Sequence, residues 1–222
     1  MEGKVKNDFK KYILFFFGNT FTEGEMNMDF KNSQTKDNLM RAFAGESQAR
    51  NRYQFAANQA KSVHQYVLAE LFEFTAKQEE AHAKVFYDHL MELSGETISI
   101  DGTYPVDISD DLVCLLNAAN HNETEEAEDV YPEFARIAQE EGYKKIALDF
   151  ENIAKIEETH ANRFEKYALL MENQELYKCD DANQQWMCLH CGHIHTGVMA
   201  PKMCPVCGYE QGHFIRLETV EG

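Results

Sequence analysis

The sequence predicts an all-α four-helix bundle followed by a small C-terminal domain that binds a metal through four cysteines. Four long segments with helical spacing of apolar residues predict the bundle. The motif Ala-Lys-x-Glu-Glu-x-His-Ala occurs twice, at residues 76–83 and 154–161, and makes the second and fourth segments related halves. Two Cys-x-x-Cys units, at residues 188–191 and 204–207, predict the metal-binding domain.

The first predicted helical hairpin lies in the N-terminal half of the chain. Its helices cover residues 35–62 and 65–93, where apolar residues recur every three or four positions without a proline. The second helix is expected to end at Ser94-Gly95, because glycine tolerates the left-handed backbone that often closes a helix. The irregular stretch 97–109 then crosses to the second hairpin.

The second predicted hairpin follows the same pattern. Its first helix runs from about residue 110 to residue 142, with Ser109 or Asp110 as N-cap, and its second helix covers residues 143–173. Because Pro132 lacks a backbone N–H, we expect it to kink the first of these helices. Two long hairpins joined by a crossing connection favour a four-helix bundle of the ferritin-like type.

Shifts in composition divide the chain into four parts. The bundle is expected to span residues 28–173, a polar and acidic linker residues 174–184, and the cysteine domain residues 185–222. Residues 1–27 share no pattern with the rest of the chain, and the codons just upstream of Met28 can spell a bacterial ribosome-binding sequence. We therefore expect residues 1–27 to be a non-native or disordered extension.

Charge and cysteine usage limit the classes of partner. Acidic residues outnumber basic ones, with 38 Asp and Glu against 21 Lys and Arg and a formal charge of -17, so neither nucleic acid nor an anionic membrane is an expected partner. The longest apolar run, residues 12–17, is too short to span a membrane. Four of the six cysteines form two tight pairs, which favours a metal site in a reducing compartment and predicts a cytoplasmic protein.

The inward face of each predicted helix is apolar except near its middle, where it carries Glu or Glu and His. These residues are Glu46 in the first helix, Glu79 and His82 in the second, Glu123 and Glu126 in the third, and Glu157 and His160 in the fourth. Burying so many unpaired carboxylates would be prohibitive, and bound cations can offset the cost. One Glu from each of two helices and Glu-x-x-His from each of the other two is the pattern that binds two iron or manganese ions in bundles.

The third helix carries one carboxylate more than the first. Glu123 is the counterpart of Glu46, so Glu126 is a surplus ligand through which the coordination could change with redox state. Beyond these carboxylates, the same spacing places Val130, Phe134 and Ile137 on the inward face.

The C-terminal cysteines predict a single tetrahedral metal. Cys188, Cys191, Cys204 and Cys207 supply four thiolates, with a glycine after each pair for the tight turn around sulfur. Zinc would make this a structural ribbon, and iron would make it a one-electron carrier. The spacing leaves both metals open, because tetrahedral sulfur suits either.

The sequence resembles the rubrerythrin family from Met28 to Leu217. The resemblance rests on AFAGESQARNRY at residues 42–53, both EExH segments, YPEFARIAQEEG at residues 131–142, and W-x-C-x-x-C-G with APKMCPVCG near the C-terminus. It implies a ferritin-like bundle with a non-haem di-iron centre and a rubredoxin-like domain with one iron held by four thiolates. The implied activity is that of a peroxidase that reduces hydrogen peroxide to water in defence against oxidative stress.

The resemblance also implies roles for individual residues. The implied di-iron ligands are Glu46, Glu79, Glu123, Glu126, Glu157 and His160. His82 would exchange with Glu126 as one iron changes oxidation state, and Tyr53 and Tyr131 would lie beside the site. The implied partners are hydrogen peroxide, an electron donor such as rubredoxin or an NAD(P)H-dependent reductase, and a second copy in a homodimer.

Two alternatives stay open at the level of the sequence. A ferritin-like protein that oxidises and stores iron would share the bundle, although storage has no evident use for an appended electron carrier. A zinc-binding tail on a scaffold bundle is the other alternative. The physiological donor, the assembly beyond a dimer, and iron against manganese in the bundle are equally open.

Overall fold

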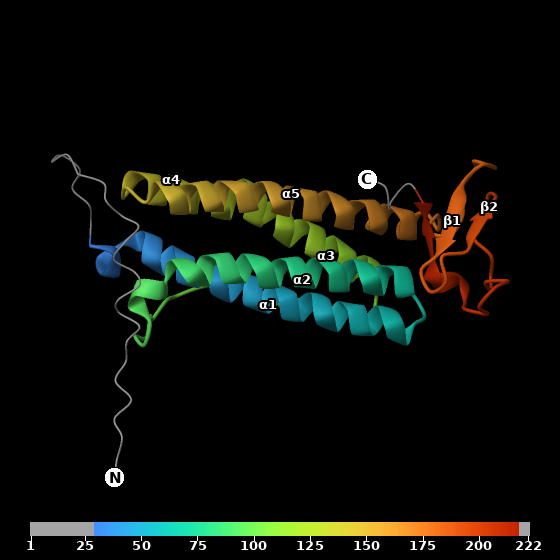
Figure 1. Cartoon of the computed structure of the whole chain (residues 1–222), viewed down its shortest axis with the longest axis horizontal. Coiled ribbons are helices and arrows are strands. Elements are labelled where there is room, and N and C mark those ends of the chain that lie inside the picture. Colours follow the sequence, from blue (N-terminus) through green and yellow to red (C-terminus); the bar gives the residue numbers. More distant parts are fainter. Residues whose placement is uncertain (1–28, 218–222) are drawn as a thin grey trace, which may run out of the picture.

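The computed structural model describes residues 29–217 and shows a helical bundle with a small β domain at one end (Figure 1). The predicted extension, residues 1–27, lies outside the described residues. The helices of the bundle are α1 (Gln34–Ser62), α2 (Tyr66–His89), α3 (Leu112–Glu125), α4 (Tyr131–Glu140) and α5 (Lys144–Glu172). No helix within residues 29–217 has the length and low charge that crossing a membrane requires.

The first hairpin pairs α1 with α2 close to the predicted bounds. Ser33 caps α1 by accepting a hydrogen bond from the backbone N–H of Lys36, which satisfies one of the free donors of the first turn. After α2, a 3₁₀ turn (Met91–Leu93) continues to the predicted end. Gly95 follows it with a φ of 92°, which favours glycine at the predicted stop.

The N-cap of α3 differs from the prediction. Asp111 is the cap, and its carboxylate accepts a hydrogen bond of 2.8 Å from the backbone N–H of Val113. Ser109 instead accepts from the backbone N–H of Asp111, in the turn that precedes the helix. The cap is therefore the residue whose carboxylate reaches the first turn, one position after the predicted Asp110.

A π-helical turn (Glu126–Val130) interrupts the third predicted helix and separates α3 from α4. Pro132 lies in the first turn of α4, where a missing backbone N–H removes no hydrogen bond within that helix. The structure thus has a wider turn directly before the proline, and the kink expected at Pro132 stays a prediction. Such single π turns are often found at functional sites, and this one begins at a predicted ligand.

The wider turn also corrects the predicted inward face beyond it. A π turn contains one more residue than an α turn, so the buried positions move by one. Tyr131, Ala135 and Ala138 are buried, whereas Val130 and Phe134, which the regular spacing places inward, are half-buried. Ile137 is buried as predicted.

Two aromatic clusters fill the bundle on either side of its middle. Phe72 packs on Phe164 with ring centroids 5.4 Å apart, and Phe86 packs on Phe150 at 4.9 Å. In the repeat, Phe150 corresponds to Phe72 and Phe164 corresponds to Phe86. Each cluster therefore pairs the phenylalanine before the motif in one copy with the phenylalanine after the motif in the other copy. The two copies are therefore antiparallel and related by an approximate two-fold axis through the space between the clusters.

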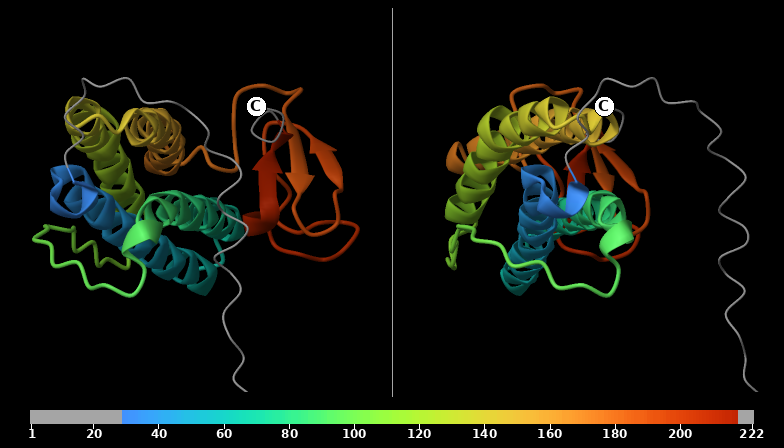
Figure 2. Two further views of the ribbon diagram at one scale, coloured as in Figure 1. Left: turned by 60° about the vertical axis from the view of Figure 1, so that its left-hand side comes forward. Right: turned by 90° about the vertical axis from the view of Figure 1, so that its left-hand side faces the viewer.

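The C-terminal domain is a three-stranded antiparallel sheet. Its strands are β1 (Gln185–Cys188), β2 (Ile194–Thr196) and β3 (Phe214–Arg216), with β1 in the middle. Trp186 and Phe214 are fully buried against the cysteine loops. Figure 1 and the left view of Figure 2 show this sheet at the end of the bundle where α2 begins.

The domain contacts its own bundle at the turn between α1 and α2. His64 Nδ1 lies 2.8 Å from Glu210 Oε2, and the ring of Tyr66 stacks on His213 with centroids 3.8 Å apart. Gly212 passes so close to His64 that a side chain would not fit between them. This close backbone approach fixes the side of the domain that faces the helices.

Gly212→Ala is expected to detach the cysteine domain from the bundle. A Cβ at this position would lie 1.9 Å from the carbonyl oxygen of His64, and a backbone group cannot turn aside as a flexible side chain can. We expect faster amide hydrogen exchange around His64 and Tyr66 in this variant. Val206→Ala, at an exposed position of the same domain, should leave the exchange unchanged. Wild-type protection around His64 in Gly212→Ala would contradict the contact.

Candidate metal centres

Six ligand-type side chains meet in the space between the two aromatic clusters. Four helices supply them, since Glu46 lies on α1, Glu79 and His82 on α2, Glu123 on α3, and Glu157 and His160 on α5. All six are buried. The repeated Glu-x-x-His spacing puts each carboxylate one turn from its imidazole on the inward face. We call this set the carboxylate site.

The carboxylate site consists of two overlapping groups whose ligand atoms lie within 4.8 Å of one another. The first group is Glu46, Glu79, His82 and Glu157, and the second is Glu79, Glu123, Glu157 and His160. Glu79 and Glu157 belong to both groups. If two ions bind here, Glu79 and Glu157 would be shared between them, while Glu46 and His82 would hold one ion and Glu123 and His160 the other.

Each of the two imidazoles lies close to both Glu79 and Glu157. His82 Nδ1 lies 2.8 Å from Glu157 Oε1 and 3.1 Å from Glu79 Oε2. His160 Nδ1 lies 2.8 Å from Glu157 Oε2 and 3.1 Å from Glu79 Oε1, with Glu123 Oε2 at 3.3 Å. One ring N–H cannot donate to two or three carboxylates at once. The arrangement instead matches donor atoms grouped around an ion.

The hydrogen bonding of these carboxylates supports a bound cation. Glu46 Oε2, Glu79 Oε1 and both side-chain oxygens of Glu157 are buried and accept no well-aligned hydrogen bond among the described residues, although imidazole nitrogens lie close to the Glu79 and Glu157 oxygens. Unpaired buried carboxylate oxygens are strongly unfavourable unless a cation compensates them. A donor set of carboxylate oxygens and imidazole nitrogens suits iron or manganese, so these residues fit a pair of such ions.

The two predicted tyrosines lie directly beside the carboxylate site. Both side chains are buried, and the Tyr53 hydroxyl donates to Glu123 while the Tyr131 hydroxyl donates to Glu46. Burial and the neighbouring carboxylates raise the pKa of both phenols well above the ordinary value, so both hydroxyls stay protonated at neutral pH. Glu46 and Glu123, which each belong to one ligand group, thus each accept a hydrogen bond from a protonated tyrosine.

Glu126 differs from the other predicted ligands. It is half-buried at the start of the π turn, and its carboxylate belongs to neither four-residue group. Burial and the nearby Glu123, Glu157 and Glu79 charges raise its pKa well above the usual range. Its role as an exchangeable ligand stays a prediction, and the structure places it at the edge of the site.

Other acidic and histidine residues lie away from the centre. Glu80, Glu125, Glu128 and Glu158 are exposed, as expected for positions off the apolar stripes. His89 pairs with Asp149 at 2.8 Å, outside the site. Sequence reasoning missed Gly45 and Tyr104, which lie near Glu126. Gly45 lies inside a predicted helix and directly before Glu46, and a glycine at such a position could have indicated a close neighbour in space.

The metal-free site concentrates opposing charges, and the pKa values reflect this. Burial raises the pKa of Glu123 to about 8, and also raises that of Glu46. Burial lowers the pKa of both imidazoles, but nearby carboxylates outweigh it and raise His82 to about 9 and His160 to about 12. Burial would raise the pKa of Glu157, yet its contacts with both histidines lower it to about 2. Without metal, this site retains protons that metal binding would displace.

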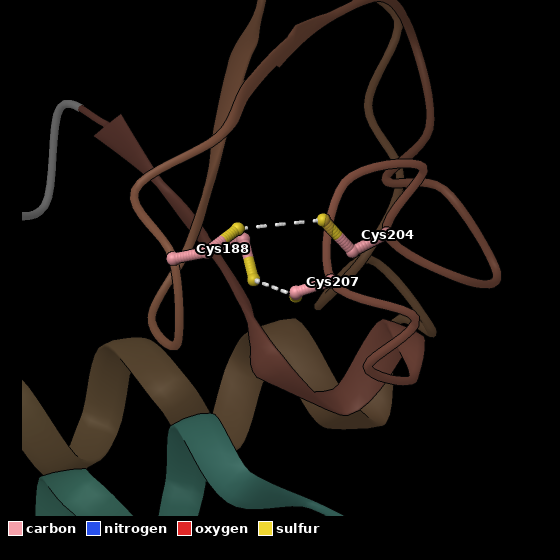
Figure 3. Close-up of side chains that lie close together, drawn as sticks. Cys188, Cys204 and Cys207 are labelled. Atoms are coloured by element: carbon pink, nitrogen blue, oxygen red, sulfur yellow. Dashed lines mark hydrogen bonds between the residues drawn. The ribbon is translucent and has the colours of Figure 1, made fainter.

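The four cysteines of the C-terminal domain form a second ligand group, and Figure 3 shows the sulfurs of Cys188, Cys204 and Cys207 turned toward one another. The Cys188 and Cys207 sulfurs are 3.7 Å apart, and those of Cys191 and Cys204 are 3.6 Å apart. Sulfurs bound at about 2.3 Å around one tetrahedral metal are separated by about 3.8 Å. All six cysteines are free, so the spacing belongs to a metal site and not to disulfides.

The backbone around Cys204 also favours the thiolate form of that side chain. Burial raises the pKa of Cys204, but backbone N–H groups of Cys207 and Val206 outweigh this and lower it to about 7. Hydrogen bonds from backbone N–H groups stabilise a thiolate, which is the form that binds metal. The domain therefore fits a four-thiolate iron or zinc.

Fold and sites together define a ferritin-like, carboxylate-bridged di-metal protein with an appended four-thiolate domain. The family model described as Rubrerythrin matches residues 37–168, and the model described as Rubrerythrin, rubredoxin-like domain matches residues 186–215. The chain belongs to the rubrerythrin family, a family of di-iron proteins. Its cofactors are accordingly two non-haem irons in the bundle and one iron in the four-thiolate site, as the resemblance implied.

Individual relatives agree with this assignment. Rubrerythrin-1 of Clostridium acetobutylicum is 41% identical over 186 residues, which cover 83% of this chain and 94% of the relative. Rubrerythrin of Porphyromonas gingivalis is 40% identical over 195 residues, 88% of this chain and 96% of the relative. The solved structure of nigerythrin in a partially reduced state matches with a TM-score of 0.55 at 29% identity, covering 83% of this chain and 90% of that chain.

Glu46→Gln is expected to change stability in opposite directions with and without metal. At pH 8 the metal-free variant should be more stable than the wild type by about 1–3 kcal/mol, because the amide replaces a buried carboxyl group that must take up a proton on folding. The stabilisation gained on adding ferrous iron without oxygen should shrink, because a ligand is lost. Thermal unfolding measures both. Glu158→Gln, beside Glu157 but exposed, is the control. Destabilisation of the metal-free variant would contradict the assignment.

The stability of the metal-free protein is expected to fall as the pH rises from about 5 to about 9. Glu46, Glu123 and the two histidines have raised pKa values when folded, so the folded state holds protons that the unfolded state releases in this range. Each retained proton contributes a slope of about 1.4 kcal/mol per pH unit. Glu157, with its lowered pKa, acts only at lower pH. Denaturant unfolding at several pH values checks this.

Iron should reverse this pH dependence. Ligands must lose protons to bind metal, so affinity rises with pH and the loaded protein should not lose stability over the same range. Parallel curves for the loaded and metal-free protein would show that the titrating groups do not hold the metal.

Proposed function

We propose that this protein is a non-haem di-iron peroxidase that reduces hydrogen peroxide to water and receives its electrons through the four-thiolate iron. The observation that carries the proposal is the presence in one chain of a buried two-ion carboxylate site and a separate four-thiolate site. The first suits a two-electron reaction on a small molecule, and the second suits one-electron transfer.

The reaction joins one hydrogen peroxide, two electrons and two protons to give two waters. When bound, the two ferrous ions supply the two electrons that cleavage of the O–O bond requires. The protein must then supply protons in a place that water does not flood. The aromatic clusters at Phe72–Phe164 and Phe86–Phe150 close the bundle on either side of the site.

The two tyrosines are the proposed proton-handling groups. Tyr53 holds its phenolic proton against Glu123, and Tyr131 holds its own against Glu46. A proton can move along each of these hydrogen bonds without any rearrangement of the backbone. Glu126, at the edge of the site and with a raised pKa, can exchange protons with the outside.

The supply of electrons is proposed to involve a second copy of the chain. The cysteine domain contacts its own bundle at Tyr66, and Glu79 follows thirteen residues later on α2, about 20 Å along the helix. A homodimer that brings the cysteine domain of one chain to the carboxylate site of the other would shorten this path. Rubredoxin or an NAD(P)H-dependent reductase is the proposed external donor, and the free cysteines support a cytoplasmic location.

An iron-storing ferroxidase is the alternative of a different class. Bacterioferritin of Mycobacterium tuberculosis shares the fold, with a TM-score of 0.55 at 20% identity over 63% of this chain and 87% of that chain. This likeness concerns the bundle, whereas the rubredoxin-like domain covers residues 186–215. The four-thiolate site favours the peroxidase, because mineral storage does not require it.

Glu79→Ala is expected to abolish peroxide turnover while leaving the visible spectrum of the four-thiolate iron intact. Glu79 belongs to both ligand groups, so its loss should cost at least about 1,000-fold in rate. Anaerobic peroxide-dependent oxidation of the reduced protein measures turnover. Glu80→Ala is the control, because the side chain of Glu80 is 60% exposed on the same helix. Turnover that survives in Glu79→Ala would show that the carboxylate site is not the reaction site.

A further inference from the structure

A groove of about 770 Å³ leads from the surface to the edge of the carboxylate site. It lies between α1 on one side and the π turn and α4 on the other, and residues 101–105, which we call the strap, form its third wall. Glu126 and Tyr131 line it and also belong to the surroundings of the site. A larger groove of about 950 Å³, between α3–α4 and α5, contains none of the predicted ligands.

The strap is tied firmly to α1. Arg41 donates from Nε to the backbone oxygen of Asp101 at 3.0 Å and from Nη2 to its carboxylate at 2.6 Å. The Tyr104 hydroxyl donates back to the backbone oxygen of Arg41 at 3.0 Å. Gly102 lies under the ring of Tyr104, where a Cβ would be 3.0 Å from its hydroxyl oxygen. These contacts hold the Tyr104 ring in a defined place on the wall of the groove.

Gly45 lies on the wall of the groove between Tyr104 and Glu126. It lies inside α1, directly before Glu46, although glycine is among the least favourable residues inside a helix. A Cβ at this position would lie 3.7 Å from the Tyr104 ring and 4.0 Å from Glu126 Oε1. A methyl group would thus touch both sides without a clash, and a larger side chain would fill the space between them. The missing side chain keeps the space open.

Charge selects what can enter the groove. Asp101, Glu125, Asp129 and Glu133 line it together with Glu126, and Arg41 is the one basic side chain among the described lining residues. Arg41 is already paired with Asp101. Glu133 is likewise paired, with Arg136. The groove still carries an excess of acidic side chains, which repels anions and admits neutral molecules.

We propose that this groove is the passage through which the oxidant reaches the carboxylate site, that Gly45 and Tyr104 form its narrow point, and that it admits small neutral hydroperoxides. This rests on the proposed peroxidase function for the nature of the oxidant. The existence of the passage is inferred from the groove, its acidic side chains, and Glu126 and Tyr131, which line it beside the carboxylate site. Hydrogen peroxide is small and neutral at physiological pH, so the acidic side chains of the groove do not repel it.

Access can be measured without turnover by following the association of nitric oxide, a small neutral ligand of ferrous iron. The full-length, iron-loaded protein is reduced anaerobically and mixed with nitric oxide in a stopped-flow instrument. Gly45→Leu should slow association at the carboxylate site by about tenfold or more, because its side chain fills the narrow point. Gly45→Ala should slow it much less. An unchanged rate in Gly45→Leu, at wild-type iron content, would overturn the proposal.

A second pair of variants tests the passage independently, in case Gly45→Leu does not fold. Thr103→Trp adds bulk to the strap at an exposed position that lines the groove, and should also slow nitric oxide. Val106→Trp adds the same bulk to an 81%-exposed position nearby that lines a different groove, and should not. Equal rates in Thr103→Trp and Val106→Trp would place the access route elsewhere.

The choice of oxidant is tested by comparing cumene hydroperoxide with hydrogen peroxide. Tyr104→Ala removes the ring that narrows the passage, so kcat/KM for the bulky hydroperoxide should rise relative to hydrogen peroxide by about tenfold. An unchanged ratio would contradict the role of Tyr104. If the wild type reduces neither peroxide but nitric oxide still responds to Gly45→Leu, the peroxidase function fails while the passage stands.

Discussion

Negative charge buried at the centre of the bundle is the constraint on which the rest of the structure depends. Glu46, Glu79, Glu123 and Glu157 are each at most 1% exposed and lie within contact distance of two imidazoles. The tyrosine hydroxyls donate to one oxygen each of Glu123 and Glu46, which does not neutralise four buried carboxylates, so the protein without metal must retain protons or repel itself. Two bound cations remove both penalties at once. The aromatic clusters on either side then make the site dry, which strengthens every interaction within it.

The approximate two-fold symmetry of the site follows from the repeat in the chain, and its functional differences lie where the symmetry fails. Glu79 and Glu157 occupy equivalent positions of the repeat, as do His82 and His160, although both imidazoles lie closer to Glu157, at 2.8 Å, than to Glu79, at 3.1 Å. The π turn breaks this equivalence by placing Glu126 at one edge, beside the groove. The additional carboxylate thus lies on the side of the site that faces the groove. In our proposal this asymmetry makes one side of an otherwise symmetric set of metal ligands accessible from the groove.

Much of the fold and of the site could be predicted because burial of a helix face leaves a regular spacing in the sequence. The stripes on α1, α2 and α5 and the residues of both ligand groups follow directly from it. The spacing fails after Glu126, because a π turn adds a residue and moves the buried face from Val130 to Tyr131. The contact of Gly212 with His64 and the strap over Gly45 join segments far apart in the chain, and no local pattern encodes such contacts.

Anomalous X-ray diffraction at the iron edge tests the central claim most directly, using crystals of the full chain reconstituted with excess ferrous iron without oxygen. We expect two peaks in the bundle, each bonded to both Glu79 and Glu157, and a third peak among Cys188, Cys191, Cys204 and Cys207. The claim would be contradicted if crystals prepared with excess iron showed no peak between α2 and α5 and the four buried carboxylates bonded to one another through shared protons.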